Sequence, residues 1–171
     1  MRIVITGTPA TGKTKLAKEL GKKLKLPVIN ELAFCQKNHV GKLNPKTGER
    51  EIPVPALTRK LNRLLKTKTR CIIEGHVVCE CKLRPIDAVI VIQSPLKKLE
   101  KRLKKRGYSD IKILDNLWSE KNGYCLKKAR QNYPTALVWP LSGRKAFKTI
   151  CKLILAKINR LKQKRGTLRA K

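Results

Sequence analysis

Acidic residues are scarce in this chain of 171 residues, where 11 Asp and Glu stand against 42 Lys and Arg and give a formal net charge of +31. No acidic residue follows Glu120, whereas the last 51 residues carry 15 Lys and Arg. Charge of this size attracts polyanions, so RNA is the first candidate partner and an anionic membrane surface the second. Adaptation to a salty or lysine-biased cell explains the same composition and stays open as a third interpretation.

Long apolar runs and paired cysteine motifs are also absent. No stretch approaches the length of a membrane span, and the strand-like run after Arg2 leaves no room for a secretory leader. The six cysteines include no C-x-x-C pair, which favours reduced thiols and a cytoplasmic protein. A zinc cluster is disfavoured because its candidate ligands fit no standard spacing. Those candidates are Cys71, His76, Cys79 and Cys81.

Hydrophobic residues make up 41% of the chain, a globular composition in which short β-branched runs alternate with helical periodicity. Strands are predicted over residues 2–6, 28–30, 71–75, 87–93 and 135–139. Helices are predicted over residues 13–25, 31–38, 56–65, 96–106 and 109–133, the last interrupted near Gly123, and a loop or hairpin over 40–55. A final amphipathic helix would bury Phe147, Ile150, Ile154, Ile158 and Leu161. This alternation predicts one α/β domain over residues 1–171, with a parallel five-stranded sheet between two layers of helices.

One motif carries most of the functional information. Residues 7–14, GTPATGKT, match G-x-x-x-x-G-K-[ST] between a predicted strand and a predicted helix, the arrangement of a phosphate-binding loop (P-loop). The glycines let backbone N–H groups point at phosphate oxygens, and the helix N-terminus adds its positive end. Lys13 is predicted to neutralise the β- and γ-phosphates, and the Thr14 hydroxyl to ligate Mg²⁺. ATP and Mg²⁺ are therefore the predicted cofactors; a plain strand–helix turn is the alternative.

Groups that could complete this site occur in two other places. Glu74 closes the apolar strand 71–75 and is predicted to orient Mg²⁺ or its water. His76 follows it at the carboxyl end of a strand, where ligands bind in open α/β sheets. Arg102 and Arg106 lie one helical turn apart, and guanidinium groups stabilise the charge of a phosphoryl group in transfer. A solvated strand end, a structural histidine and a solvated basic helix face are the respective alternatives.

Three segments together resemble the adenylate kinase isoenzyme 6 family, namely GTPATGKTKLAKEL, IIEGHVV and LEKRLKKRGYSDIKILDN. The resemblance runs from Met1 to about Ile158. It implies the P-loop NTPase fold of a nucleoside monophosphate (NMP) kinase, with an NMP-binding segment over residues 30–53 and a short lid over 105–115. It further implies adenylate kinase activity, ATP plus AMP giving two ADP, with ATPase activity. Small-ribosomal-subunit maturation is implied as well, with rRNA and a small-subunit ribosomal protein as partners.

The resemblance also assigns roles residue by residue. The implied ATP-binding residues are Ala10, Gly12, Lys13, Thr14, Lys15, Arg106 and Arg144. Glu74 and His76 match an acid-x-His motif that handles Mg²⁺ and the water or phosphate. Lys13, Glu74, His76 and Arg106 are thus the expected catalytic set, and Thr14 and Glu74 the expected metal ligands. The chain is predicted to end in a basic helix and tail over 144–171, and on the RNA-binding hypothesis the basic carboxyl-terminal third of the chain would hold rRNA.

The chain departs from the family pattern at several positions. The family usually has Gly where Ala10 stands and Ser or Thr where Lys15 stands; Ala10 is expected to keep the loop with a negative φ. Segment 121–131 is basic where the family tends to be acidic. Segment 30–44 holds no arginine. The cation that binds the monophosphate would therefore be Lys37, Lys42, Arg50 or Arg59.

Three functions remain after this comparison. The first is an NMP kinase acting on AMP or another monophosphate. The second is a ribosome-assembly ATPase that binds RNA and has little kinase activity. The third is a small-metabolite kinase of the shikimate type, which shares the P-loop and the size but explains the charge and the RGYS lid poorly.

Overall fold

A five-stranded parallel sheet forms the centre of the molecule in the computed structural model, which describes residues 1–45, 48–142, 152 and 156. In spatial order its strands are β2 (Val28–Asn30), β5 (Cys71–Glu74), β1 (Arg2–Thr6), β6 (Ala88–Gln93) and β7 (Leu137–Ser142). Each neighbouring pair is parallel. The predicted parallel α/β sheet is therefore confirmed, and the strand that leads into the P-loop occupies its middle.

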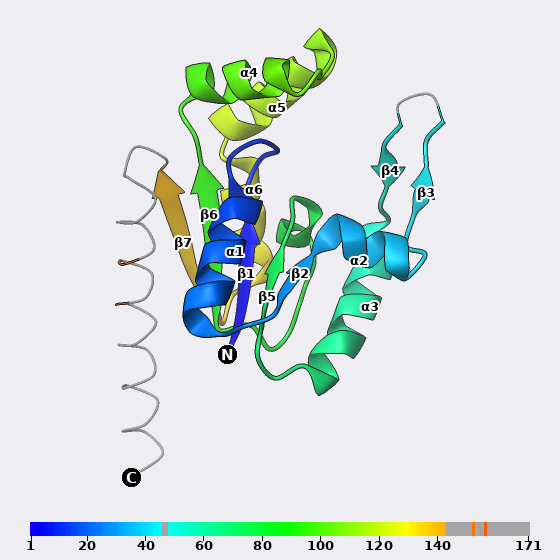
Figure 1. The fold of residues 1–171 in the computed structure, drawn as a ribbon, viewed down its shortest axis with the longest axis vertical. Helices are drawn as coiled ribbons and strands as arrows, with labels where there is room; N and C mark the ends of the chain where they lie inside the picture. Colours follow the sequence, from blue (N-terminus) through cyan, green and yellow to red (C-terminus); the bar gives the residue numbers. More distant parts are fainter. Residues whose placement is uncertain (46–47, 143–151, 153–155, 157–171) are drawn as a thin grey trace.

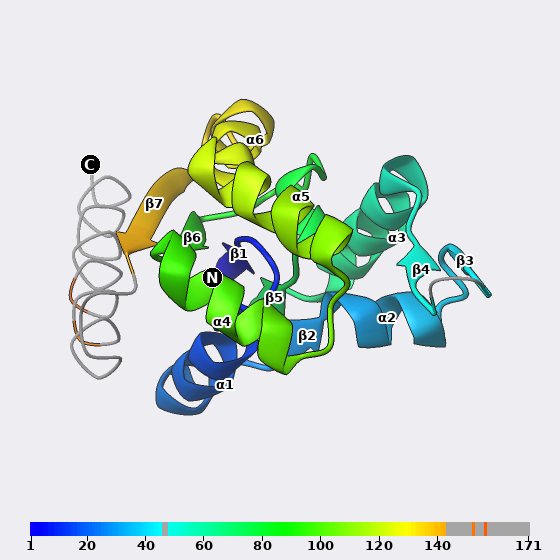
Figure 2. The same cartoon turned by 90° about the horizontal axis from the view of Figure 1, so that it is seen from above.

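Helices connect the strands and cover the sheet (Figures 1 and 2). They are α1 (Lys13–Leu24), α2 (Glu31–Lys37), α3 (Val54–Thr67), α4 (Leu96–Lys105), α5 (Asp110–Lys121) and α6 (Tyr124–Asn132), with a short 3₁₀ helix η1 (Val77–Cys79). The predicted break at Gly123 separates α5 from α6, where this residue has φ 62°. The segment 40–55 contains the antiparallel hairpin β3 (Lys42–Leu43) and β4 (Arg50–Glu51).

Alternate residues of the central strand serve two separate cores, because successive side chains of a strand point to opposite faces. Ile3 belongs to a buried cluster with Leu20 of α1. Val4 belongs to the cluster on the other face, which holds Leu61 of α3 and Ala129 of α6. All five of these side chains are fully buried. The sheet is thus sandwiched between α1 and the pair α3 and α6, giving the three layers expected from the sequence.

A third, smaller cluster lies over the carboxyl ends of the strands. Ala10 of the P-loop packs there with Leu99 and Leu103 of α4 and with Ile113 of α5. Figure 1 shows α4 and α5 above the loop that leaves β1. This pair of helices therefore roofs the end of the sheet at which the P-loop lies.

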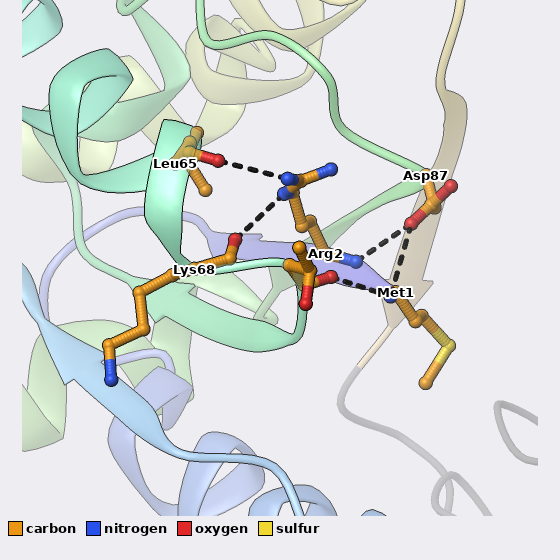
Figure 3. Close-up of polar contacts among 6 residues, drawn as sticks. Met1, Arg2, Leu65, Lys68 and Asp87 are labelled. Carbon is orange, nitrogen blue, oxygen red and sulfur yellow. Dashed lines mark hydrogen bonds and ion pairs between the residues drawn. The ribbon is translucent and has the colours of Figure 1, made fainter.

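The opposite end of β1 is fixed by a group of polar contacts (Figure 3). The Arg2 backbone N–H donates to Asp87 Oδ2 at 2.7 Å, and its guanidinium donates to the carbonyls of Leu65 and Lys68, both at 2.9 Å. The Met1 amino group donates to the Thr69 carbonyl at 2.9 Å. These contacts join the start of β1 to the end of α3 and to the residue before β6, so the central strand enters the sheet at a fixed position.

Two elements, α3 and β7, differ from their predicted bounds by two residues or more, and each contains a proline. Helix α3 begins at Val54 rather than at residue 56, because Pro55 lies in the first turn, where no N–H is needed. Strand β7 begins at Leu137 and continues through Pro140. It is the outermost strand of the described sheet, a place that tolerates proline.

Several sequence predictions concern residues that the structure does not describe. The final amphipathic helix with Phe147 to Leu161, Arg144 and the basic tail to residue 171 lie outside the described residues, apart from the isolated positions 152 and 156. Within the described ranges, none of the helices combines the length and the apolar character needed to cross a membrane.

Candidate active site

The shape of the loop between β1 and α1 depends on two glycines. Gly7 has φ 144°, and a Cβ atom there would lie 2.3 Å from the Ile92 carbonyl oxygen of β6. No side chain fits so close to a backbone oxygen, so Gly7 is required for the loop to pass the neighbouring strand. Gly12 has φ 105° and caps the N-terminus of α1. The loop therefore ends where a helix presents its free N–H groups, which is where phosphates bind.

The Lys13 side chain folds back inside this loop. Its Nζ donates to the carbonyl oxygens of Gly7 at 2.9 Å and Thr8 at 3.1 Å. Burial lowers the pKa of Lys13 from its usual value, with Glu31 and Glu74 among the nearby groups that act against this change. The ammonium group thus lies where a phosphate in the loop would need a cation. To bind that phosphate it would have to give up only these two carbonyl contacts.

Thr14 and Glu74 meet beside the first turn of α1. Glu74 ends β5, which is hydrogen bonded to β1 with Ile5 opposite Glu74, so the parallel register brings the carboxylate next to the P-loop. Glu74 is 1% exposed, and its Oε1 accepts from Thr14 Oγ1 at 3.0 Å and from Asn30 Nδ2 at 2.5 Å. The carboxylate is therefore held by two donors and is not a solvated strand end.

This pair fits a magnesium ion by its chemistry. Mg²⁺ prefers oxygen ligands and in kinases uses one or two protein groups together with substrate phosphates and waters. A hydroxyl and a carboxylate 3.0 Å apart meet that requirement. Within the described residues no group of three or more His, Cys, Asp and Glu side chains is arranged to hold a metal ion.

His76 approaches the loop from the segment after β5. Its Nδ1 lies 3.1 Å from the Gly7 carbonyl oxygen and 3.6 Å from Cys125 Sγ. Burial acts to lower the pKa of His76, but contact with Cys125 outweighs it and the pKa is raised overall. Four of the predicted residues, Lys13, Thr14, Glu74 and His76, are thus gathered around one loop, although they come from segments far apart in the sequence.

Arg102 of α4 and Arg106 at its C-terminal cap differ in exposure and in contacts. Arg102 is half-buried, and its Nη1 donates to the carbonyl of Ala10 at 3.2 Å and approaches that of Thr11 at 3.5 Å. Arg106 caps the C-terminus of α4, with an exposed side chain next to the turn that leads to α5. Arg102 supports the back of the P-loop, whereas Arg106 is on the surface of the predicted lid. Lys15 is exposed on the first turn of α1.

Comparison with known proteins agrees with this arrangement. A family model described as an AAA domain matches residues 3–123. A Pyrococcus furiosus protein provisionally named an adenylate kinase is 33% identical over 144 residues, covering 84% of this chain and 77% of that protein. The adenylate kinase isoenzyme 6 homolog of Caenorhabditis elegans is 30% identical over 148 residues, covering 82% and 79%. The chain belongs to the adenylate kinase isoenzyme 6 family.

Solved structures agree on the fold. The shikimate kinase of Aquifex aeolicus superposes with a TM-score of 0.61 at 18% sequence identity, covering 95% of this chain and 99% of that chain. At that identity the likeness concerns the fold alone. Together with the family assignment and the P-loop, it makes this member of the adenylate kinase isoenzyme 6 family a P-loop phosphotransferase.

The expectation of a negative φ at Ala10 is wrong. Ala10 has φ 65°, in the left-handed region that glycine adopts without strain. An alanine there costs about 1–2 kcal/mol in conformational energy. Its methyl group is 6% exposed and packs against Leu99 and Leu103, and burial of one methyl returns about 0.8 kcal/mol. Packing under α4 therefore offsets much of the strain, and the loop keeps its shape.

Glu120 is a P-loop contact that the sequence analysis missed. Its Oε2 accepts from Thr8 Oγ1 at 2.5 Å, and its Oε1 accepts from the Ser94 backbone N–H at 2.6 Å. Burial raises the pKa of Glu120, an effect that these two donors oppose. The carboxylate thus joins α5 to the loop and to the end of β6. The sequence feature that could have identified Glu120 is its position as the last acidic residue of a cationic chain.

One arginine of the predicted NMP-binding segment is hydrogen bonded to the protein backbone. Arg50 Nη1 donates to the carbonyl oxygens of Val40 at 3.2 Å and Gly41 at 2.7 Å, which fixes the hairpin. Lys37, Lys42 and Arg59 are exposed. Of the four cations that could grip a monophosphate, Arg50 therefore has a structural role in this conformation.

Proposed function

We propose that this protein is an NMP kinase that transfers the γ-phosphoryl group of ATP to AMP and gives two ADP. The observation that carries the proposal is the meeting of Lys13, Thr14 and Glu74 at one loop, under a helix pair whose connecting turn carries Arg106. Phosphoryl transfer needs little covalent chemistry from the protein, because positioning and charge stabilisation supply most of the catalysis. The family assignment supports a nucleotide as substrate.

Each residue then has a definite task. Lys13 exchanges its carbonyl partners for phosphate oxygens of ATP and neutralises the charge that develops there. Thr14 and Glu74 would hold Mg²⁺, which when bound neutralises charge on the β- and γ-phosphates. Arg106 would reach the moving phosphoryl group when the lid, residues 105–115, closes. His76 lies beside Gly7 and would position the acceptor or a water molecule.

The acceptor site is proposed for residues 30–53. With Arg50 bonded to Val40 and Gly41, the monophosphate would be bound by exposed lysines of α2 and β3, Lys37 and Lys42. Ammonium groups bind phosphate as point charges without the two-pronged geometry of arginine. A weakly held AMP leaves water as a competing acceptor. ATPase activity is therefore the second candidate function, and the engagement of Arg50 by the Val40 and Gly41 carbonyls is the observation that favours it.

Incubation with Mg·ATP in the presence and absence of AMP separates the two candidates. We expect ADP to form rapidly with AMP and slowly without it, because an in-line acceptor held by the protein reacts faster than water. Replacing AMP by GMP, CMP and UMP in parallel reactions measures acceptor preference. An unchanged rate of ADP formation without any monophosphate would overturn the kinase proposal in favour of an ATPase.

RNA is proposed as a macromolecular partner, in keeping with a role in small-subunit rRNA maturation beside a ribosomal protein. The net charge of +31 supports this proposal. A groove of about 650 Å³ between α3 and the segment after η1 carries four cations and one acid at its walls. These residues are Arg59, Arg63, Lys66, Lys82 and Glu80. Arg59, Arg63 and Lys66 follow one another at successive turns of α3, a spacing that suits a row of phosphates.

The salt dependence of binding tests this partner. We expect the affinity for an rRNA fragment to fall steeply with salt, and the double variant Arg63→Ala, Lys66→Ala to reduce the slope by about two, because each lost phosphate contact removes about one unit. Lys18→Ala with Lys22→Ala on α1 removes the same charge elsewhere and controls for net charge. A slope near zero in the unmodified protein would refute electrostatic RNA binding.

A further inference from the structure

Two buried cysteines lie next to the P-loop and have no part in the proposed reaction. Cys79 ends η1 and Cys125 is in the first turn of α6, and their residues are 0% and 4% exposed. Each of the two thiols shifts the pKa of the other, as neighbouring groups do. Cys79 Sγ also lies 3.1 Å from the His76 carbonyl oxygen, and Cys125 Sγ lies 3.6 Å from His76 Nδ1. The tertiary fold therefore pairs two thiols that are far apart in the sequence.

His76 connects this pair to the nucleotide loop. The same Nδ1 that faces Cys125 lies 3.1 Å from the Gly7 carbonyl oxygen. A carbonyl oxygen can only accept, so the hydrogen of this contact belongs to Nδ1. The Cys125 sulfur then lies 3.6 Å from a nitrogen that carries a hydrogen, a contact that favours the thiolate over the thiol. A line of contacts thus runs from Cys79 through Cys125 and His76 to the first residue of the P-loop.

The two sulfurs differ in character. The hydrogen bond from Cys79 lowers the pKa of Cys125, and His76 and Lys13 act in the same direction against burial. The same hydrogen bond raises the pKa of Cys79. A thiolate is the reactive form of cysteine, and a neighbouring thiol resolves its oxidation product. At Cys35 of α2, by contrast with Cys125, burial dominates and raises the pKa of the thiol to about 11.

We propose that Cys79 and Cys125 form a reversible oxidation site for peroxides. The Cys125 sulfur attacks one oxygen of the peroxide and breaks the O–O bond, which leaves a sulfenic acid and releases water or an alcohol. The Cys79 sulfur then attacks the sulfenic sulfur, an S–S bond forms, and the hydroxyl leaves as water with the Cys79 proton. The two thiols supply the two electrons that the peroxide accepts.

The disulfide would alter the P-loop through His76. An S–S bond is about 2.05 Å long, so the Cys125 sulfur is drawn toward Cys79 and loses its place beside Nδ1. The imidazole then lacks one of the two groups that orient it against Gly7. On the proposed kinase function, we expect oxidation to lower nucleotide turnover several-fold and a dithiol reductant to restore it.

Peptide mapping of the full chain after hydrogen peroxide treatment tests the site without reference to activity. We expect one cross-linked peptide pair containing Cys79 and Cys125, lighter by two hydrogens and separated by dithiothreitol. A link between other cysteines, or sulfinic acid at Cys125 without a link, would overturn the proposal. Since this measurement is read by mass, its outcome is independent of whether AMP is the acceptor.

Two variants connect the bond to turnover. Cys125→Ser should keep its own turnover rate in peroxide, while the matched variant Cys35→Ser should lose and regain turnover like the unmodified protein. The variant Cys79→Ser keeps Cys125 in place but lacks the thiol that resolves the sulfenic acid. Its oxidation should therefore be irreversible. Equal peroxide sensitivity in Cys125→Ser and the unmodified protein would contradict a role for this pair.

Discussion

Lys13→Ala is expected to lower ATP turnover by about a thousandfold or more, because the cation that meets the phosphates is lost and its contribution grows as charge develops in the transition state. The ammonium group lies inside the loop, 2.9 Å from the Gly7 carbonyl oxygen. Steady-state ADP formation with ATP and AMP measures the effect. RNA affinity should be largely retained, since one charge of many is removed.

Lys18→Ala is the matched control for this variant. Lys18 is exposed on the same helix, one turn farther along α1, and its loss removes the same charge without touching the loop. Thermal unfolding of both variants checks that the fold persists. Turnover by Lys13→Ala above a tenth of the unmodified rate would mean that this loop does not bind the reacting phosphates.

Glu74→Gln is expected to lower kcat about a hundredfold and to raise the Mg²⁺ concentration needed for half-maximal turnover. The amide keeps the size of the carboxylate and one acceptor oxygen for Thr14 and Asn30, which donate to it at 3.0 and 2.5 Å. The negative charge that would attract the metal ion is removed, and an electrostatic contribution of this kind is typically worth about 10²–10³ in rate. Turnover measured across a Mg²⁺ titration gives both quantities.

Glu100→Gln serves as its control, because Glu100 only forms a solvent-exposed ion pair with Lys104 within α4. Such exposed pairs contribute little to stability, so this variant should match the unmodified protein in kcat and in Mg²⁺ dependence. An unaltered Mg²⁺ titration for Glu74→Gln would exclude this carboxylate from the metal site.

Local sequence patterns were sufficient to predict the sheet and the proximity of the candidate site residues around the P-loop. The β-branched runs predicted the strands, and the P-loop motif identified Lys13 and Thr14. Glu74 could be added because an acid at the end of a buried strand lies next to the loop in a parallel sheet. The observed register, with Ile5 opposite Glu74, provides that proximity. These features depend on periodicity and on neighbours in the chain, which a sequence contains directly.

Contacts made by the helices above the loop could not be predicted in the same way. Glu120 reaches Thr8 and Ser94 only because α5 returns over the sheet. Arg102 reaches Ala10 only because α4 lies above the loop. The sign of φ at Ala10 likewise follows from packing under α4, which makes a conformation tolerable that local preference disfavours. Such details follow from tertiary placement, which helix periodicity leaves open.

The fate of the γ-phosphoryl group tests the central claim most directly. ATP labelled at the γ-phosphorus is incubated with the full chain, Mg²⁺ and unlabelled AMP, and the products are separated by chromatography. A kinase that joins the P-loop to an acceptor site at residues 30–53 places the label in the β-position of ADP, with little in inorganic phosphate. Label recovered only as inorganic phosphate, at a rate independent of AMP, would contradict the kinase function and leave an ATPase.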